Sequence, residues 1–164
     1  IRYLQLMNRI SIIFILTLFL FPLKSVYTRS RNICGYIEKV YIKNLNLHYV
    51  ALMDTGAHFC TLHAYGIRGY RKNNKLLVTF FTRNRKGKRL KKTMPVEKVV
   101  WIRSSIGFNQ KRYAVFMKIK LGKQIKRVIV TLTNRNRQKQ LMIVGRNFLK
   151  NYFLVDAGKK FYHY

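Results

Sequence analysis

The stretch Leu-Met-Asp-Thr-Gly-Ala, residues 52–57, decides the fold predicted for this chain. An apolar run that begins at Tyr49 leads directly into Asp54, and Gly56 allows the tight turn that follows. Only 4 of the 164 residues are acidic, and one of them stands at the end of this strand-like run. Burying a carboxylate is costly unless it is hydrogen-bonded or paired. The position therefore marks Asp54 as a candidate functional residue.

The composition indicates one folded domain with an extreme positive charge. The chain is 49% hydrophobic, enough for a core, and 34 Lys and Arg against 4 Asp and Glu give a net charge of +30. Such a charge predicts salt-dependent attraction to polyanions, with an anionic membrane surface and nucleic acid as the obvious partners. The alternative is a compositional bias of the lineage without any charge-based function.

The first 28 residues have the layout of a signal peptide. An uncharged apolar run at 10–23 follows Arg2 and Arg9 and precedes a short segment at 25–28. The run is shorter than the roughly 20 residues that a membrane-spanning helix prefers. No Ala-x-Ala cleavage pattern is present, so an uncleaved N-terminal anchor is the alternative. Both interpretations predict secretion across the inner membrane and a periplasmic or membrane-anchored location.

From Ile33 onward the pattern predicts an all-β barrel or sandwich. Short runs rich in β-branched and aromatic residues alternate with turn residues, and Trp101 is expected to fill the core. The segment 145–151 is the one expected helix, and 157–159 is an expected turn. The expected strands are 35–43, 47–53, 76–82, 96–102, 113–121, 125–132, 141–144 and 153–156.

A second motif, Met-Ile-Val-Gly-Arg-Asn-Phe-Leu at 142–149, also contains an apolar strand-like run. The two motifs together resemble the retropepsin-like aspartic peptidases, in which the first carries the catalytic Asp and the second leads into a short helix. Four further segments, at 35–40, 62–64, 132–135 and 153–156, make the resemblance specific to one family among these peptidases. They are similar to a bacterial family often labelled an ATP-dependent zinc protease and found near ATP-grasp peptide ligases. The peptidase domain would span 33–164.

The resemblance implies a retropepsin-like closed barrel with one short C-terminal helix and the activity of an aspartic endopeptidase. Such enzymes hold a water between two carboxylates that share one proton, one acting as base and the other as acid. The chain has one Asp-Thr-Gly, so activity on a peptide or protein substrate implies a homodimer in which two copies of Asp54 meet. Because the positive field works against the shared proton, we expect an acidic pH optimum.

The same resemblance assigns supporting roles around Asp54. Thr55 would brace the turn through its hydroxyl, and Gly56 would let backbone N–H groups approach the carboxylates. Ala57 is small enough to leave room for substrate. His63, Gly145 and Arg146 are expected to be structural residues near the site.

Two features depart from the family pattern. Residues 58–60 read His-Phe-Cys where the family has a Lys or Arg followed by Thr-Ser. In viral retropepsins an acidic residue after the Ala can pair with the Arg of Gly-Arg-Asn, a role that His58 cannot take. Arg146 is therefore expected to form a buried ion pair with Asp156 or to have no acidic partner. A Gly-rich flap is not evident, and the candidate flaps are 83–89 and 104–109.

Neither a metal nor another cofactor is expected. His58, Cys60 and His63 form His-x-Cys-x-x-His, which suggests zinc, but His-Glu-x-x-His is missing and a catalytic zinc needs three well-placed ligands. No Gly-x-x-x-x-Gly-Lys-Ser/Thr loop is present to hold ATP. The sequence does not decide whether Cys34 and Cys60 form a disulfide.

A non-catalytic module is the alternative function. It would have the same retropepsin-like fold and would bind an anionic envelope polymer or nucleic acid through its charge of +30. Nucleic acid is the less favoured partner, because export would separate the protein from RNA.

Overall fold

The computed structural model describes residues 30–103 and 109–163. The predicted leader and most of the flap candidate at 104–109 lie outside these residues. All described secondary structure belongs to one compact unit, Arg31–Tyr164. In this part of the chain no helix is both long enough and apolar enough to cross a membrane.

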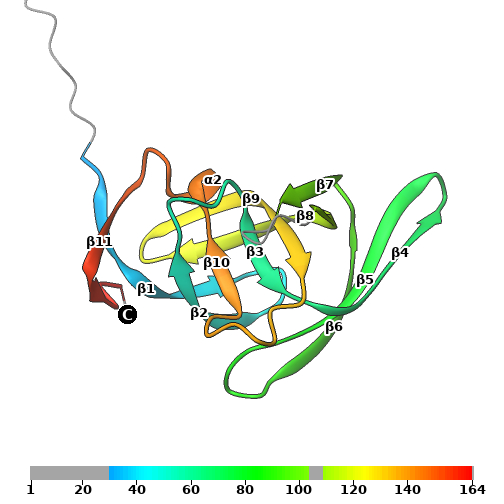
Figure 1. The fold of residues 1–164 in the computed structure, drawn as a ribbon, viewed down its shortest axis with the longest axis horizontal. Helices are drawn as coiled ribbons and strands as arrows, with labels where there is room; N and C mark the ends of the chain where they lie inside the picture. The colour runs from blue at the N-terminus through cyan, green and yellow to red at the C-terminus, as the bar shows by residue number, and fades with distance from the viewer. Residues whose placement is uncertain (1–29, 104–108, 164) are drawn as a thin grey trace, which may run out of the picture. The chain divides into compact units, whose positions relative to one another are not determined.

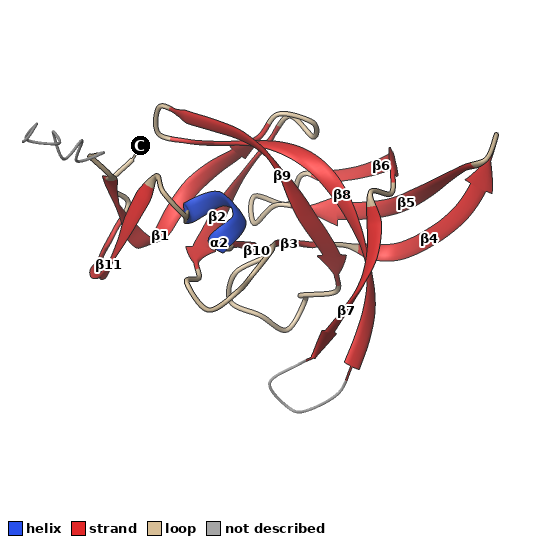
Figure 2. Cartoon of the chain, turned by 90° about the horizontal axis from the view of Figure 1, so that it is seen from above, coloured by secondary structure: helices blue, strands red, loops and turns tan. Residues whose placement is uncertain are grey.

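The described chain is built of strands and contains one short helix near its C-terminus, so the predicted all-β class and the helix position are confirmed (Figure 1, Figure 2). The strands of the main sheet are β1 (Asn32–Ile42), β2 (Leu47–Met53), β3 (Cys60–His63), β7 (Lys98–Arg103), β8 (Asn109–Leu121), β9 (Gln124–Thr133), β10 (Met142–Val144) and β11 (Phe153–Lys160). The strands of the second sheet are β4 (Tyr65–Lys72), β5 (Lys75–Arg83) and β6 (Arg89–Pro95), and the helix is α2 (Arg146–Leu149).

The main sheet has the strand order β11-β1-β2-β10-β3-β9-β8-β7, and a further pairing of β1 with β8 joins its two halves into a closed ring. The closure is possible because β1 is long: its first residues pair with β11, and Tyr41 and Ile42 pair with β8. Alternate residues of β1, β2, β8 and β9 point inward and form the core. Val40, Leu62 and Phe148 are among its fully buried members.

The second sheet, of order β4-β5-β6, extends from one side of the main sheet (Figure 1). Its inner face carries Val78, Phe80 and Met94, which are buried. On that face β4 lies so close to β8 that a Cβ on Gly69 would meet the hydroxyl of Tyr113. The two sheets therefore pack on each other rather than forming separate domains.

β3, β4 and β6 are not among the strands expected from the sequence. All four residues of β3 are buried, so this strand shows no alternation of apolar and polar residues. Most of β4 and much of β6 are exposed and basic, a composition that predicts loops. The prediction of a turn at 157–159 is wrong, because β11 continues through these residues to Lys160. The pairing of β11 with β1 shifts its register between Gly35 and Ile37.

The interpretation of Trp101 as a core residue is also wrong. Its side chain is 68% exposed. Trp101 lies on β7, the end strand of the main sheet, where one neighbouring strand, β8, pairs with it. An end strand is covered on fewer sides than a central one, so an aromatic residue there is not forced into the core.

Candidate active site

Asp54 lies at the end of β2, in a turn that its own carboxylate organises. Its Oδ1 accepts hydrogen bonds from the backbone N–H of Gly56 at 2.8 Å and of Ala57 at 3.0 Å. The backbone N–H of Asp54 donates to the carbonyl of Val144 in β10 at 3.0 Å. No hydrogen bond is found for Oδ2 within the described residues, and the side chain is half-buried. One carboxylate oxygen thus fixes the turn, and the other is left for chemistry.

The second motif, at 142–149, packs against this turn and supports it. β10 lies between β2 and β3, and the chain then enters α2 against residues 57–59 (Figure 2). The N–H of Arg146 donates to the carbonyl of Ala57 at 2.8 Å. A Cβ on Gly145 would lie 2.6 Å from the carbonyl oxygen of Phe59, so only glycine allows this close approach of the two backbones.

Arg146 is held at the turn by carbonyl groups and not by a carboxylate. Its Nη1 donates to the carbonyls of Thr55 and Gly56, both at 3.1 Å, and the residue is exposed. Asp156 instead lies opposite Gly35 of β1 and accepts a hydrogen bond from the hydroxyl of Tyr162 at 2.7 Å. That hydrogen bond is the largest cause of the lowered pKa of Asp156. The expected buried ion pair of Arg146 is therefore wrong, because β11 carries Asp156 to β1.

Asn147 is a structural residue that the sequence analysis did not single out. Its Oδ1 accepts from the N–H of Cys60 at 3.0 Å and its Nδ2 donates to the carbonyl of Ile129 at 2.7 Å, so it ties α2 to β3 and β9. The signal was available in the sequence, because Asn147 belongs to the same Gly-Arg-Asn motif as Arg146.

His63 is buried on β3 behind the turn. Its Nδ1 accepts from the backbone N–H of Arg135 at 3.0 Å, and its Nε2 has no hydrogen-bond partner among the described residues. Burial lowers the pKa of His63, and the charges of Arg83 and Arg135 lower it further. His63 is therefore the neutral support of the loop that follows β9.

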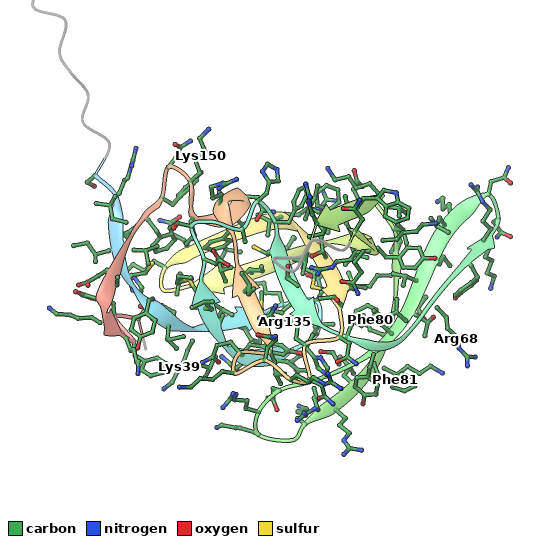
Figure 3. The ribbon with its side chains drawn as sticks, viewed as in Figure 1. Lys39, Arg68, Phe80, Phe81, Arg135 and Lys150 are labelled. Carbon is green, nitrogen blue, oxygen red and sulfur yellow. The ribbon has the colours of Figure 1, made fainter. Side chains whose placement is uncertain are left out.

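Arg135 is the functional candidate that the sequence analysis passed over (Figure 3). Burial lowers the pKa of its guanidinium, the charge of Arg112 lowers it further, and the carboxylate of Asp54 raises it. Arg135 belongs to the loop after β9, where its Nε donates to the carbonyl of Gln140 at 3.0 Å. Arg135 lies in the segment 132–135 that carried part of the family resemblance, and only the fold brings its charge within electrostatic range of the Asp54 carboxylate.

The residues present do not fit the zinc that the family label implies. Within the described ranges no group of three or more His, Cys, Asp and Glu side chains could hold a metal ion. His58 is exposed, whereas Cys60 and His63 are buried. Cys34 and Cys60 are free, and burial raises the pKa of each thiol to about 12, so neither is a ready metal ligand.

Residues 33–164 match the model of the RimB-like family, described as the retropepsin-like aspartic endopeptidase RimB. The chain belongs to this family. The match covers all the strands except the first residue of β1, so the closed ring and the Asp-Thr-Gly turn lie within the matched region.

Curated relatives of this RimB-like chain have another name. Two are probable α-L-glutamate ligases, from Shewanella pealeana, 33% identical over 114 residues, and from Shewanella halifaxensis, 32% identical over 114 residues. A third probable α-L-glutamate ligase, from Parasynechococcus marenigrum, is 27% identical over 109 residues. The matches cover 65% to 68% of this chain and 23% to 25% of the relatives, so the chain spans about a quarter of their length.

A solved structure has the same fold. It is a protein of unknown function from Legionella pneumophila, with a TM-score of 0.68 and 30% sequence identity. The similarity covers 81% of this chain and 98% of the Legionella protein. The RimB-like fold therefore occurs as a nearly complete chain there and as a quarter of a longer chain in the ligases.

Proposed function

We propose that the protein is an aspartic endopeptidase that hydrolyses peptide bonds with a water held between two Asp54 carboxylates of a homodimer. The observation that carries the proposal is the Asp54 turn: Oδ1 is fixed by two backbone N–H groups, and Oδ2 is left without a partner in the described residues. Family membership supports the same reaction class.

The reaction needs two carboxylates that share one proton. The ionised Asp54 takes a proton from the water while the water oxygen bonds to the peptide carbonyl carbon. The protonated Asp54 of the other copy gives its proton to the carbonyl oxygen, which yields a tetrahedral diol. The Asp54 that took the proton from water then gives it to the amide nitrogen, while the other Asp54 regains a proton from a hydroxyl of the diol. The C–N bond breaks, and an amine and a carboxylic acid are released. Each copy contributes one carboxylate, so a monomer lacks half of the chemistry.

Two surface features favour a homodimer. Thr55 and Gly56 are exposed, so the turn is accessible to a second copy. Ile33 and Leu154 are directly paired across β1 and β11 and are 50% and 51% exposed, which gives an apolar edge that a second copy could cover. Two chains of +30 repel each other, and we expect association to strengthen as salt screens this repulsion.

We propose an acidic peptide as substrate. Arg112 and Arg135 are half-buried, and the charges of Arg112 and Asp54 both act on Arg135. Arg112 lines a shallow depression of about 340 Å³ together with Gln110 and Asn134. Half-buried guanidinium groups favour carboxylates as partners. The names of the ligase relatives concern glutamate, which fits the same substrate class.

The second candidate is a non-catalytic module that binds a polyanion, favoured by the charge of +30. Its binding would weaken steeply with salt and would not respond to substitution of Asp54. Export, a periplasmic location and a membrane anchor rest on residues 1–28 alone and stay predictions.

The test is hydrolysis of a peptide library that includes oligoglutamate sequences, by wild-type protein and by Asp54→Asn. We expect cleavage by the wild type with an acidic optimum, and a mass-spectrometric product pattern that the variant does not produce. Cleavage that persists in Asp54→Asn, or that a chelator abolishes, would contradict the proposal. Asp156→Asn is the matched control, because Asp156 lies on β11 with Tyr162 as its partner.

A further inference from the structure

The outer face of the second sheet has a composition unlike that of the inner face. Residues directly opposite each other in a sheet point to the same side. Tyr65 pairs with Phe81 and Phe81 with Lys91, while Arg68 and Thr93 both pair with Thr79. The register thus places aromatic and basic side chains together on the side that faces away from buried Phe80 (Figure 3).

Three aromatic side chains lie on this face. The rings of Tyr65 and Phe81 stack with centroids 5.6 Å apart and an interplanar angle of 21°. Phe81 is 37% exposed and Tyr70 is 43% exposed. The face therefore presents flat apolar rings to solvent in the middle of a strongly basic sheet.

Basic side chains lie on the same face as these aromatic rings. Nζ of Lys91 lies 5.7 Å from the centroid of Phe81. No acidic residue occurs between Tyr65 and Pro95, so no carboxylate of this sheet neutralises the charge. The exposed cations that the register places on this face are Arg68, Lys72, Lys75, Arg89 and Lys91.

We propose that the outer face of β4, β5 and β6 binds single-stranded nucleic acid. Unpaired bases would stack on Tyr70 and Phe81, and the surrounding Lys and Arg side chains would contact the phosphates. A sheet that combines exposed rings with a positive field has both parts of such a site. The net charge of +30 left the class of polyanion open, and the register of β4–β6 now favours single-stranded nucleic acid.

The rings decide between single-stranded nucleic acid and other anions. An acidic peptide or an anionic membrane would satisfy the cations but has no planar groups to stack on exposed aromatic side chains. A duplex hides the faces of its bases in its own stack. Single strands offer phosphates and free base faces at the spacing of consecutive nucleotides.

The binding test uses fluorescence anisotropy of the full chain with a labelled oligouridylate about 12 nucleotides long, a length within the usual range for a single-strand site. We expect binding that is tighter than that of the matching duplex and of an oligoglutamate peptide of equal charge. The slope of log K against log salt should be about −2 to −4, as expected for three to five phosphate contacts. Equal affinity for the three ligands would overturn the proposal.

Substitutions separate stacking from charge. Phe81→Ala and Tyr70→Ala should each weaken oligouridylate binding about 5- to 100-fold, the range for loss of one stacked base. Trp101→Ala is the matched control, because Trp101 is an exposed aromatic residue on β7, outside this sheet. An equal loss in Trp101→Ala, or no loss in either sheet variant, would contradict the proposal.

Net charge needs its own control. Arg68→Gln with Lys91→Gln removes two charges from the face, and Lys118→Gln with Lys120→Gln removes two exposed charges from β8. We expect the salt slope to fall by about 1 in the first pair and to stay nearly unchanged in the second. Equal slopes for the two pairs would overturn the proposal, because only total charge would then matter.

The site is independent of the proposed peptidase activity. The three variants of this face, Phe81→Ala, Tyr70→Ala and the double variant Arg68→Gln with Lys91→Gln, should cleave a short peptide at the wild-type rate, and Asp54→Asn should bind oligouridylate with wild-type affinity. Loss of cleavage with intact binding therefore reports on the peptidase proposal alone, and the reverse result reports on this one.

Discussion

Glu38 and Asp54 are two of the 4 acidic residues of the chain, and the fold treats them differently. Glu38 in β1 is fully buried, and both of its oxygens accept hydrogen bonds: Oε1 from the N–H groups of Gly35 and Tyr162, Oε2 from that of His163. Asp54 is half-buried and uses one oxygen in its turn.

The difference shows how one chain makes a structural and a reactive carboxylate. The carboxylate of Glu38 joins β1 to the residues that follow β11, and its hydrogen-bonding capacity is used there. The carboxylate of Asp54 keeps Oδ2 available beside an exposed surface. A buried, fully hydrogen-bonded carboxylate serves stability, and a partly satisfied one at a surface can exchange a proton with substrate.

The largest effect should come from Asp54→Asn. An amide cannot act as base, so we expect peptide hydrolysis to fall at least 10²- to 10⁴-fold, the usual contribution of an acid–base group. The free energy of unfolding should change by less than about 1 kcal/mol, since an Asn side-chain oxygen can accept the same two turn hydrogen bonds. Initial rates measure the hydrolysis, and urea unfolding measures the stability. Strong destabilisation of Asp54→Asn would show that Asp54, like Glu38, is a structural carboxylate.

Glu38→Ala should show the opposite profile. Three backbone N–H groups lose a charged acceptor, which should lower the free energy of unfolding by about 3–5 kcal/mol. Glu97→Ala is the control, because it removes the same charge from an exposed residue. Equal urea midpoints for the two variants would show that Glu38 does not hold the C-terminal residues.

Gly145→Ala tests how tightly the Asp54 turn is supported. The new Cβ would lie 2.6 Å from the carbonyl oxygen of Phe59 and 2.8 Å from that of Ala57, both backbone atoms. We expect a loss of about 1–3 kcal/mol in the free energy of unfolding, typical of overpacking. Gly158→Ala is the control, since its nearest neighbour would be a side-chain oxygen of Asp156 at 3.3 Å. A neutral Gly145→Ala would mean that the turn and α2 can move apart.

Arg146→Gln should have a smaller effect. It weakens two hydrogen bonds to the carbonyls of Thr55 and Gly56 in an exposed setting, worth about 1 kcal/mol together. Because these bonds hold the Asp54 turn, peptidase activity should fall more than stability does. Arg137→Gln, in the exposed loop after β9, removes the same charge as a control. Identical rates of peptide hydrolysis for the two variants would show that Arg146 does not support the site.

His63 gives the smallest effect, visible as a pH dependence. Its pKa in the folded protein is lowered, so the unfolded chain takes up a proton first as pH falls below the ordinary value near 6.5. Stability should therefore decrease as pH falls below that value, and His63→Gln should remove part of the decrease. His48→Gln, on an exposed side chain, should leave it unchanged. Urea midpoints between pH 7 and pH 5 measure the effect, and parallel curves for wild type and His63→Gln would contradict it.

Strong local patterns made much of the fold predictable. Residues 47–53 form a strand with the predicted bounds, and Gly145 and Arg146 lie at the start of the one described helix. The missed strands β3, β4 and β6 have no apolar alternation, because β3 is wholly buried and the other two are largely exposed. The prediction that Trp101 fills the core was wrong, because the sequence around an aromatic residue does not show whether its strand lies inside a sheet or at its edge.

The sequence by itself determined the class of the fold, the Asp-Thr-Gly turn and the motif that supports it, because these depend on neighbouring residues and their spacing. Only the tertiary structure decided which partners the charged groups have. It placed Arg146 on carbonyls and Asp156 beside Tyr162, brought Arg135 within electrostatic range of Asp54, and put the rings of β4 and β5 on one basic face. These pairings join residues that are far apart along the chain, and no local pattern records which strand will lie beside which.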